Sequence, residues 1–431
     1  MEFGAPPAKA GKQELRRRNT LLLLSLIQSE GPSSQAELAR RSALSPATVS
    51  GILQPLIESR ILVEEGKSTA GLGRRASILA FNPRANLTAG VCIDLEEVEV
   101  ALVDLSGRVL DQTSTGYPRY TEPNEVVTLA AQCLATLEAR NSLTRDSIAG
   151  VGVAMPGLIN SSTGLVQVAS NLGWMNVQLR DLFEQRFGLS VRVEHLGRAK
   201  ARAEAIWGKG KNHRNFVCLE IGSGIGAGVV VHGRLLRGAG GIGGEVGHMP
   251  VDASGPVCAC GFKGCWEVFC SGPAIRKSLA RRLAEGTNSA DLNSTGTNSI
   301  GTNSSGTLSP MATLADLELA YVQGDADAIA VVEEWASYFV RGLVGVIWSF
   351  DPEFILLTGP VVHQCPSLVE AAKRLISGLK GNARSFNIPL ILESHPAGTG
   401  VVGAAATVAT RYLEELASSG SPREIRLAAA Q

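Results

Sequence analysis

A histidine and three cysteines form the densest group of metal-binding side chains in the sequence. The group consists of His248, Cys258, Cys260 and Cys265, and its three thiols fall within eight positions. One imidazole and three thiolates are the ligand set of a closed, tetrahedral structural zinc site. Gly261 and Gly264 allow the backbone between the last two thiols to fold tightly. The alternative is a buried cysteine cluster or a local disulfide, which is less common in a reducing cytoplasm.

Length and composition indicate an ordinary globular protein. The 431 residues have room for two or three domains, and 45% hydrophobic with 19% charged residues is typical of such chains. The apolar run at 21–27 is too short to span a membrane, and no leader pattern precedes it. We therefore expect a cytoplasmic protein with no membrane partner. The scattered cysteines are interpreted as buried or incidental: Cys92, Cys133, Cys218, Cys270 and Cys365.

The net charge of zero hides an uneven distribution. Residues 1–84 contain 12 Lys and Arg against 7 Glu and no Asp, so the remainder of the chain is mildly acidic. A basic front end on an acidic body favours contact between the front end and a polyanion. Charge alone is weak evidence, because many solvated faces are basic.

The first 84 residues contain the pattern of a helix-turn-helix. We expect a helix over 14–29, and Ser34 with Glu37 three positions later forms the capping-box pattern before a short helix over 35–41. A tight turn follows at Ala43. Ser45 then caps a second helix that has Pro46 at its first position, where a missing N–H costs nothing.

The second of these helices is predicted to be the recognition helix. Its start should face base edges in the major groove, and the residues there are small: Ser45, Ala47, Thr48 and Ser50. The predicted buried face is Val49, Ile52, Leu53 and Leu56. Pro55 predicts a kink or an early end of this helix.

Two strands after the recognition helix predict a wing. Residues 61–63 and 77–81 have strand character, and a glycine-rich turn joins them. Arg74 and Arg75 at its tip are placed to contact phosphate or to enter a minor groove. The interpretation is a DNA-binding winged helix for residues 14–84. The alternative is a three-helix module that binds protein.

The rest of the chain alternates strands and helices, as α/β folds do. Strands are expected at 87–94, 98–104, 150–156, 190–194, 216–220 and 353–358, and helices at 316–350 and 403–418. Residues 286–309 repeat GTNS three times and cannot bury a core, so we expect a flexible insertion there.

The zinc motif resembles that of the ROK family, which comprises repressors, open reading frames and sugar kinases. The family pattern is GH, a spacer, and CxCGxxGCxE, and every fixed position is present from Gly247 to Glu267. The resemblance implies a winged helix followed by two actin-like α/β lobes with a cleft between them. The expected parts are an arm (1–13), the winged helix (14–84), a first lobe (85–205, closed by a helix at about 403–418), a second lobe (206–402) and a tail (419–431).

The same resemblance implies a sugar site. Glu245 and Glu267 match carboxylates that contact sugar in the family, and Asn171 lies in a segment similar to the loop before the sugar site. His248 can bind zinc through one ring nitrogen and face the sugar with the other. His195 stands where sugar-binding relatives have an asparagine. Carboxylates suit sugars because they accept hydrogen bonds from hydroxyl groups. The alternative roles for these side chains are salt bridges and caps.

Two departures from the kinase pattern argue against catalysis. Leu196 occupies the position of the general-base aspartate, and a leucine accepts no proton. The first phosphate loop, DxGxT in kinases, reads Asp94-Leu95-Glu96-Glu97-Val98, with two carboxylates that repel phosphate. The glycine loop from Gly222 to Gly228 is kept, and we favour a structural role for it over phosphate binding.

Together these features predict a zinc-containing transcriptional regulator without kinase activity. We expect a homodimer or homotetramer that represses carbohydrate-utilisation genes by binding a palindromic double-stranded DNA operator, with a sugar or sugar derivative as effector. The alternatives are a sugar kinase, and a regulator that responds to a protein partner or a non-sugar metabolite.

Overall fold

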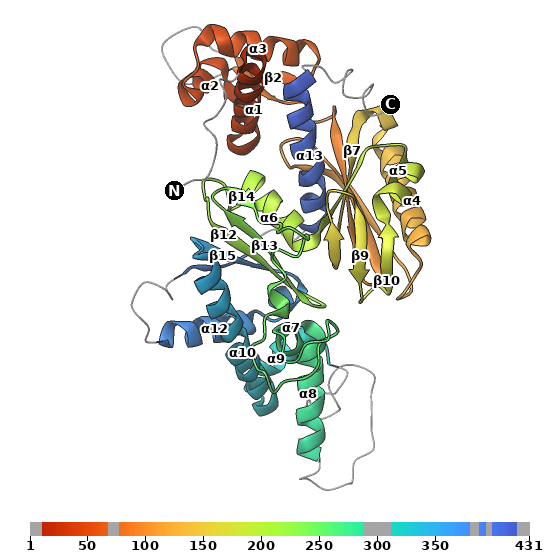
Figure 1. Ribbon diagram of the computed structural model, residues 1–431, viewed down its shortest axis with the longest axis vertical. Coiled ribbons are helices and arrows are strands. Elements are labelled where there is room, and N and C mark those ends of the chain that lie inside the picture. Colours follow the sequence, from red (N-terminus) through yellow and green to blue (C-terminus); the bar gives the residue numbers. More distant parts are fainter. Residues whose placement is uncertain (1–10, 68–76, 288–311, 380–387, 394–398, 420–431) are drawn as a thin grey trace. The chain divides into compact units, whose positions relative to one another are not determined.

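The computed structural model describes residues 11–67, 77–287, 312–379, 388–393 and 399–419 (Figure 1). It divides into two compact units, of which unit 1 comprises residues 1–211 with 397–431 and unit 2 comprises residues 212–396. The predicted wing arginines Arg74 and Arg75 lie outside the described residues. So do most of the predicted insertion, arm and tail. Among the helices that are described, none is long and apolar enough to cross a membrane.

The N-terminal part of unit 1 is a winged helix. Its helices are α1 (Lys12–Glu30), α2 (Gln35–Ser42) and α3 (Pro46–Glu58). Its sheet has the order β1-β3-β2, from β1 (Ser33–Ser34), β3 (Ser77–Phe81) and β2 (Leu62–Lys67). The predicted helix-turn-helix and the two wing strands are therefore confirmed.

Side-chain caps set the starts of α2 and α3. The Ser34 hydroxyl accepts the backbone N–H of Glu37, and the Ser45 hydroxyl accepts that of Thr48, each at 3.2 Å. Ala43 adopts a left-handed conformation, φ 56°, in the turn between the helices. The capping box at Ser34 is incomplete, because the Glu37 carboxylate accepts hydrogen bonds from Arg40 instead.

The predicted early end of the recognition helix at Pro55 is wrong, because α3 continues to Glu58. The apolar face holds the helix together through buried Ile52, Leu53 and Leu56. A proline removes the N–H that would bond the carbonyl four residues earlier. Here that carbonyl belongs to Gly51, and it accepts a long hydrogen bond of 3.5 Å from the Arg16 guanidinium.

The rest of unit 1 is an α/β lobe with a five-stranded sheet of order β11-β7-β4-β5-β6. The strands are β4 (Leu87–Ile93), β5 (Glu97–Val103), β6 (Val109–Gly116), β7 (Ile148–Met155) and β11 (Val191–His195). Strands β4, β7 and β11 are parallel, and β5 and β6 are antiparallel. A smaller sheet contains β8 (Leu158–Asn160), β9 (Leu165–Ala169) and β10 (Trp174–Gln178).

Helices cover both faces of the five-stranded sheet. Helices α4 (Pro123–Asn141) and α5 (Leu179–Phe187) share one apolar core with it. Helices α6 (Leu196–Trp207) and α13 (Thr399–Ser419) pack on the other face. A short 3-10 helix, η1 (Arg145–Ser147), precedes β7. Helix α13, the last helix of the described residues, thus packs on the sheet of the first lobe.

Unit 2 is built on a second five-stranded sheet of order β14-β13-β12-β15-β16. Its strands are β12 (Phe216–Ile221), β13 (Ile225–Val231), β14 (Arg234–Leu235), β15 (Phe354–Thr358) and β16 (Leu390–Leu392). Its helices are η2 (Val246–His248), α7 (Glu267–Cys270), α8 (Gly272–Thr287), α9 (Leu314–Val322), α10 (Ala326–Phe350), α11 (Pro360–Gln364) and α12 (Pro366–Gly378). The long helix α10 contributes Trp335 and Phe339 to the buried core.

Candidate metal centre and DNA-reading helix

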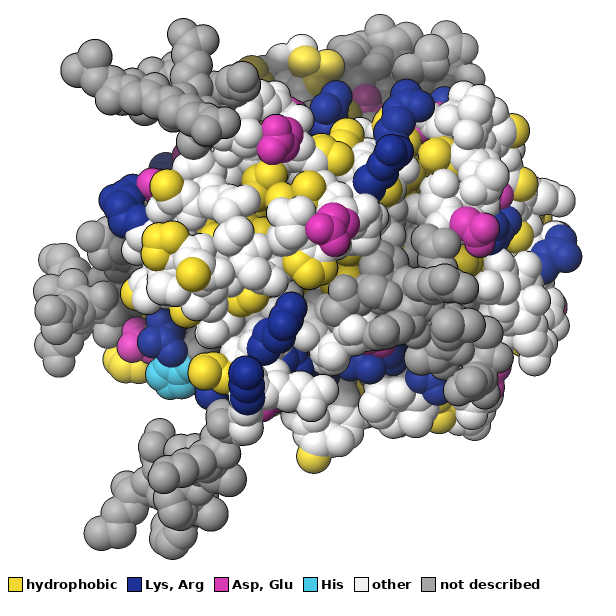
Figure 2. Space-filling model, turned by 90° about the horizontal axis from the view of Figure 1, so that it is seen from above, with side chains coloured by type: hydrophobic (Ala, Val, Ile, Leu, Met, Phe, Trp, Pro, Cys, Tyr) yellow, Lys and Arg dark blue, Asp and Glu magenta, His cyan; other side chains and the backbone are white. Residues whose placement is uncertain are grey.

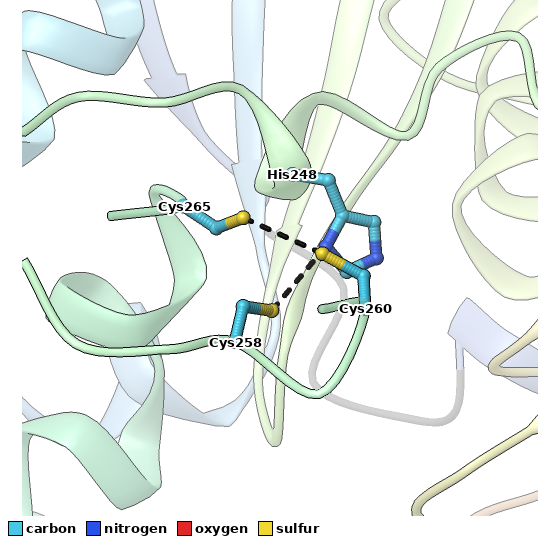
Figure 3. Close-up of side chains that lie close together, drawn as sticks. All are labelled: His248, Cys258, Cys260 and Cys265. Atoms are coloured by element: carbon cyan, nitrogen blue, oxygen red, sulfur yellow. Dashed lines mark hydrogen bonds between the residues drawn. The ribbon is translucent and has the colours of Figure 1, made fainter. Parts of the chain in front are cut away.

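The four predicted metal ligands converge on one point in unit 2 (Figure 3). The donor atoms of His248, Cys258, Cys260 and Cys265 all lie within 4.8 Å of one another. Two of the separations, Cys258 Sγ to His248 Nδ1 and Cys260 Sγ to Cys265 Sγ, are 3.6 Å. Four donors around a tetrahedral zinc with Zn–S near 2.3 Å are separated by about 3.8 Å. The spacing and the donor set therefore fit such an ion.

The loop that carries the thiols is folded by its own backbone. Isolated bridges pair Pro250 with Cys265 and Val257 with Lys263, which closes a small hairpin around the cluster. Gly264 has φ 70°, and a Cβ built on it would lie 1.6 Å from the Asp252 carbonyl oxygen. A residue with a side chain is therefore excluded there, as the glycine spacing predicted.

Trp266, which sequence reasoning did not single out, anchors this loop to the core. It lies between Cys265 and Glu267 in the chain, is 0% exposed, and donates its backbone N–H to the Met249 carbonyl at 2.9 Å. Its ring packs against Phe339 of α10, with centroids 5.2 Å apart. The signal available in the sequence was an aromatic residue between a thiol ligand and a carboxylate. Burial of this ring fixes both neighbours in place.

The electrostatics of the cluster favour a bound cation. Burial raises the pKa of the Cys258 and Cys265 thiols, and the nearby Glu267 carboxylate raises that of Cys258 further. Thiolates gathered in such a place are costly unless a positive charge compensates them. A divalent cation supplies that charge and binds the thiolate forms.

Glu267 lies between the four predicted metal ligands and the glycine loop that connects β12 to β13. One of its carboxylate oxygens lies 3.0 Å from Cys258 Sγ and 3.6 Å from His248 Nδ1. The other would lie 2.9 Å from a Cβ on Gly224. Glu245 precedes His248 by three residues, and its carbonyl accepts the His248 backbone N–H at 3.2 Å. The structure thus brings Glu267 and His248 together, and Glu245 is the residue directly before η2.

The glycine loop itself is a tight turn. Gly222 donates its N–H to the Gly224 carbonyl at 3.0 Å, so the loop closes on itself between paired Ile221 and Ile225. A Cβ on Gly222 would lie 3.6 Å from the Glu220 carboxylate. A carboxylate beside the loop disfavours phosphate, and Gly224 is needed to leave room for Glu267. Both observations favour the structural role.

The two predicted effector residues of unit 1 lie in different environments. Asn171 is exposed in the turn between β9 and β10. His195 is only 6% exposed at the end of β11. Burial, with the neighbouring Arg198 guanidinium, lowers the pKa of His195 to about 3, so its imidazole is neutral near pH 7. His195 is therefore a neutral hydrogen-bonding group at the carboxyl edge of the sheet.

Leu196 begins α6 directly after His195 and packs into an apolar cluster. Its neighbours there are Ala154, Ala199 and Ala404. Close by, Glu194 and Arg198 form a buried ion pair at 2.8 Å, and Glu194 also accepts the Ser161 hydroxyl at 2.6 Å. Sequence reasoning missed this pair, because Glu194 belongs to β11 and Arg198 to α6, and their contact depends on how the strand joins the helix. These two contacts therefore hold the Glu194 carboxylate in the interior of the lobe.

The predicted DNA-reading residues lie on the outer side of α3. Ser45, Ala47 and Ser50 are exposed, Thr48 is half-buried, and its hydroxyl lies 2.8 Å from that of Ser45. The predicted buried face is confirmed in full, with Val49, Ile52, Leu53 and Leu56 in the core. Lys and Arg side chains protrude from the face of the molecule that is uppermost in Figure 1 (Figure 2). The exposed arginines among the described residues of this domain are Arg16, Arg18, Arg40, Arg41, Arg60 and Arg84.

Comparison with known proteins agrees with this architecture. The ROK family model matches residues 88–411, and a model for winged helix-turn-helix DNA-binding domains matches residues 16–63. A xylose repressor from Bacillus spizizenii is 27% identical over 364 residues, which cover 84% of this chain and 87% of that protein.

Solved structures of a regulator and of a sugar kinase both match this chain. A ROK family transcriptional regulator, described as a homolog of the E. coli MLC protein, matches with a TM-score of 0.74 at 25% identity, over 94% of this chain and 98% of that one. A ROK family glucokinase from Streptomyces griseus, in complex with glucose and AMPPNP, matches with a TM-score of 0.63 at 27% identity. That match covers 75% of this chain and 99% of the kinase. The chain belongs to the ROK family and, with its N-terminal winged helix-turn-helix, to the family's transcriptional regulators.

Proposed function

We propose that this protein represses carbohydrate-utilisation genes by binding a palindromic operator, and that a sugar or sugar derivative releases it. The observation that carries the proposal is the start of α3. Small polar and methyl-bearing side chains there are exposed on a winged helix, and the buried face of the same helix is apolar. In helix-turn-helix proteins this part of the recognition helix approaches base edges in the major groove.

Two copies of α3 are needed to read the two halves of a palindrome, so the proposal includes a homodimer or homotetramer. Contacts of Ser45 and Thr48 with phosphate or bases then fix the register of each copy. Arg74 and Arg75 at the wing tip are proposed as phosphate or minor-groove contacts. The proposed compartment is the cytoplasm, where thiols remain reduced.

The metal is proposed to be a structural zinc. His248, Cys258, Cys260 and Cys265 would hold it, and the ion contributes a cross-link between distant points of the loop rather than a reaction. Trp266 and its two neighbours, Cys265 and Glu267, are thereby kept in one arrangement. The site braces Glu267 and His248 without taking part in chemistry.

The proposed effector-binding residues of unit 2 are Glu245, His248 and Glu267, and those of unit 1 are Asn171 and His195. Carboxylates accept hydrogen bonds from adjacent sugar hydroxyls, and an imidazole that faces a metal with Nδ1 can offer Nε2 to a hydroxyl. Support comes from the placement of Glu267 and His248 at the metal cluster, and from relatives that are named xylose repressor.

The absence of kinase activity is the fourth part of the proposal. Leu196 stands at the position of the family's catalytic aspartate and packs against Ala154, Ala199 and Ala404. General-base catalysis commonly contributes about 10²–10⁴ in rate, and a leucine contributes none of it. An ATP-consumption assay over a panel of sugars is expected to show no turnover, and turnover with any sugar would favour the kinase alternative.

DNA binding is tested by fluorescence anisotropy with DNA from upstream of the gene, at one fixed salt concentration. We expect tight, sequence-selective binding that one sugar weakens. Replacement of Thr48 with Val keeps the shape of the side chain and removes its hydroxyl, and should weaken binding. Thr136→Val, at an exposed threonine of α4, is the matched control. Equal affinity of both variants and wild type would count against α3 as the DNA-reading element.

A further inference from the structure

The exposed face of α3 extends beyond the four residues predicted from the sequence to meet DNA. Three further residues of this helix are exposed after Ser50, namely Gly51, Gln54 and Glu58. Together with Ala47 they follow the spacing i, i+4, i+7 and i+11, which places them along one side of a helix. This side lies opposite the buried face of α3, so it is directed away from the protein core.

Gly51 lowers the stability of α3 without serving its packing. A glycine inside a helix is unfavourable relative to alanine, because its backbone loses more freedom on folding. Gly51 lies in the middle of α3 and is absent from the described residues with positive φ. A Cβ built on it would meet nothing within 4 Å. Within the described structure, therefore, neither the backbone conformation nor the packing requires a glycine at this position.

Glu58 is also unfavourable for the helix. It is the last residue of α3, where its carboxylate lies at the negative end of the helix dipole. It is exposed on the same side as Gly51, and a carboxylate there repels DNA phosphate. Residues that break local rules on one face of a stable element are typical of functional sites. The reason for Gly51 and Glu58 is therefore sought in what this face binds.

The contact between Glu58 and Gln54 fixes the orientation of the Gln54 amide. Gln54 Nε2 donates a hydrogen bond to Glu58 Oε1 at 2.9 Å. An ionised carboxylate only accepts hydrogen bonds, so it must face the nitrogen of the amide and not the oxygen. The amide nitrogen carries two hydrogens, and Glu58 takes one of them. A second N–H and the amide oxygen are left for a partner outside the chain.

This donor and acceptor match the edge of an adenine. In the major groove adenine presents the N6 amino group as donor and N7 as acceptor, and glutamine pairs with both. Gln54 Oε1 would accept from N6, and the second hydrogen of Nε2 would donate to N7. Guanine presents two acceptors at the same positions, so its O6 would face the oxygen of the amide. The fixed amide of Gln54 therefore favours adenine over guanine.

Gly51 and Arg16 suit a close approach of this face to DNA. Gly51 lies three residues before Gln54, on the same side of α3, and its missing Cβ lets another molecule approach the backbone closely. The Arg16 guanidinium of α1 donates to the Gly51 carbonyl at 3.5 Å. A cation is thus held beside Gly51, where it complements the charge of DNA phosphates. This charge favours a polyanion over an apolar protein partner.

We propose that Gln54 determines the operator sequence by pairing with an adenine in each half-site. Glu58 is a positioning residue that orients the Gln54 amide, and Gly51 allows the helix to come close enough for this contact. The inference rests on the proposed function, which requires that the winged helix binds an operator. It adds the base that is recognised and the three residues that recognise it.

The direct test is selection of duplexes from a random-sequence DNA pool by the full-length protein. Gln54→Ala is compared with wild type and with Gln132→Ala, which makes the same change at an exposed position inside α4. Wild type and Gln132→Ala should select one motif with an A·T pair in each half-site. Gln54→Ala should lose the preference at that pair and bind the wild-type motif about 5- to 150-fold more weakly, as expected for loss of a bidentate contact.

A modified base tests the atoms involved. Replacing that adenine with 7-deazaadenine removes the N7 acceptor and keeps the pairing with thymine. In fluorescence anisotropy the modified duplex should bind wild type more weakly and should bind Gln54→Ala as well as the unmodified duplex does. An equal loss of affinity in both proteins would show that another residue contacts this adenine.

Two further variants are expected to change stability or affinity in opposite directions, which loss of structure cannot explain. Gly51→Ala should raise the melting temperature and weaken binding to the motif. Gly378→Ala, at an equally open position of α12, should leave DNA affinity unchanged. Glu58→Gln removes a negative charge, so affinity for random duplex DNA should rise. Because a glutamine both donates and accepts, it no longer fixes the Gln54 amide, and the preference for adenine should fall.

The outcomes separate this inference from the proposed function. If wild type selects a motif and Gln54→Ala selects the same motif with equal preference, the role of Gln54 is wrong and the proposed function stands. If wild type selects no motif, the proposed function fails and the inference fails with it. If Gly51→Ala binds the motif as tightly as wild type, close approach at Gly51 is wrong. An unchanged adenine preference in Glu58→Gln would exclude Glu58 as a positioning residue.

Discussion

The indole of Trp266 lies directly on the backbone of Gly342 in α10. A Cβ built on Gly342 would come within 2.1 Å of the indole Cε2. Because Trp266 stands between Cys265 and Glu267, this contact connects the central helix of unit 2 to a predicted metal ligand and a predicted effector ligand. Because Gly342 has no Cβ, the Trp266 ring fits against α10, and this contact determines where Cys265 and Glu267 lie.

Replacing Gly342 with Ala in α10 should disturb the loop that carries the three predicted thiol ligands, although Gly342 is not part of that loop. Overpacking of a well-filled core costs about 1–3 kcal/mol, and here the added atom pushes on a buried ring. We expect a lower melting temperature and weaker zinc retention in a chelator titration. Gly378→Ala is the control, since a Cβ there meets nothing within 4 Å. Zinc retention equal to wild type in Gly342→Ala would disprove the connection.

Removal of one thiol should release the metal and loosen the fold of unit 2. Cys260 is exposed, so Cys260→Ser leaves no buried cavity and tests ligation directly. Wild type is expected to contain one zinc per chain by elemental analysis, and the variant less, with a lower melting temperature. Cys133→Ser, at a buried cysteine of α4, should retain its zinc. Full zinc occupancy in Cys260→Ser would exclude Cys260 as a ligand.

Two replacements of Ser45 separate helix capping from DNA contact. Ser45→Ala loses the bond to the Thr48 N–H and should cost about 1 kcal/mol of stability together with DNA affinity. Ser45→Asp keeps a capping oxygen and places a favourable negative charge at the helix start, so stability should match wild type. Its carboxylate repels phosphate, so DNA affinity should fall further. Thermal melting measures the change in stability, and fluorescence anisotropy measures the change in DNA affinity. Unimpaired DNA binding by Ser45→Asp would show that the start of α3 does not approach the DNA.

Acidification should destabilise unit 1 through His195. Its pKa is lowered from 6.5 to about 3 by burial, first, and by Arg198, so the unfolded chain binds the proton more readily than the folded one. Stability is therefore present above pH 6.5 and is lost as pH falls toward 3, with a slope of up to about 1.4 kcal/mol per pH unit. His195→Gln should make this decline shallower in melts between pH 7 and 4.5. The exposed His363→Gln is the control, and identical slopes in all three proteins would rule out His195 as the cause.

Local patterns predicted the elements well because their causes are local. The caps at Ser34 and Ser45, and the apolar face of α3, depend on spacings of three and four residues that are visible in the chain. The convergence of the four predicted metal ligands could be predicted for the same reason, since short spacings and two glycines bring them together. The early end of α3 predicted at Pro55 was wrong. Proline has no N–H for the Gly51 carbonyl, and this carbonyl accepts a hydrogen bond from Arg16, which is 35 residues away.

Features that depend on distant partners could not be read from the chain. The need for glycine at position 342 is visible only once Trp266 is placed against α10. The burial of His195 and the ion pair of Glu194 with Arg198 depend on packing by α6 and α13. The sequence also gave no sign that Leu413 and Leu416 belong to the core of the first domain, since their apolar spacing suits any amphipathic helix.

A hydrophobic core shared by α13 and the winged helix has a consequence for biosynthesis. Ala409, Tyr412, Leu413 and Leu416 of α13 pack with buried residues of α1–α3. During translation, α1–α3 leave the ribosome first, and α13 begins 341 residues after the end of α3, counted from Glu58 to Thr399. At about 5–20 residues per second, that interval is on the order of tens of seconds. A nascent chain therefore holds α1–α3 without part of their apolar core until synthesis has reached α13.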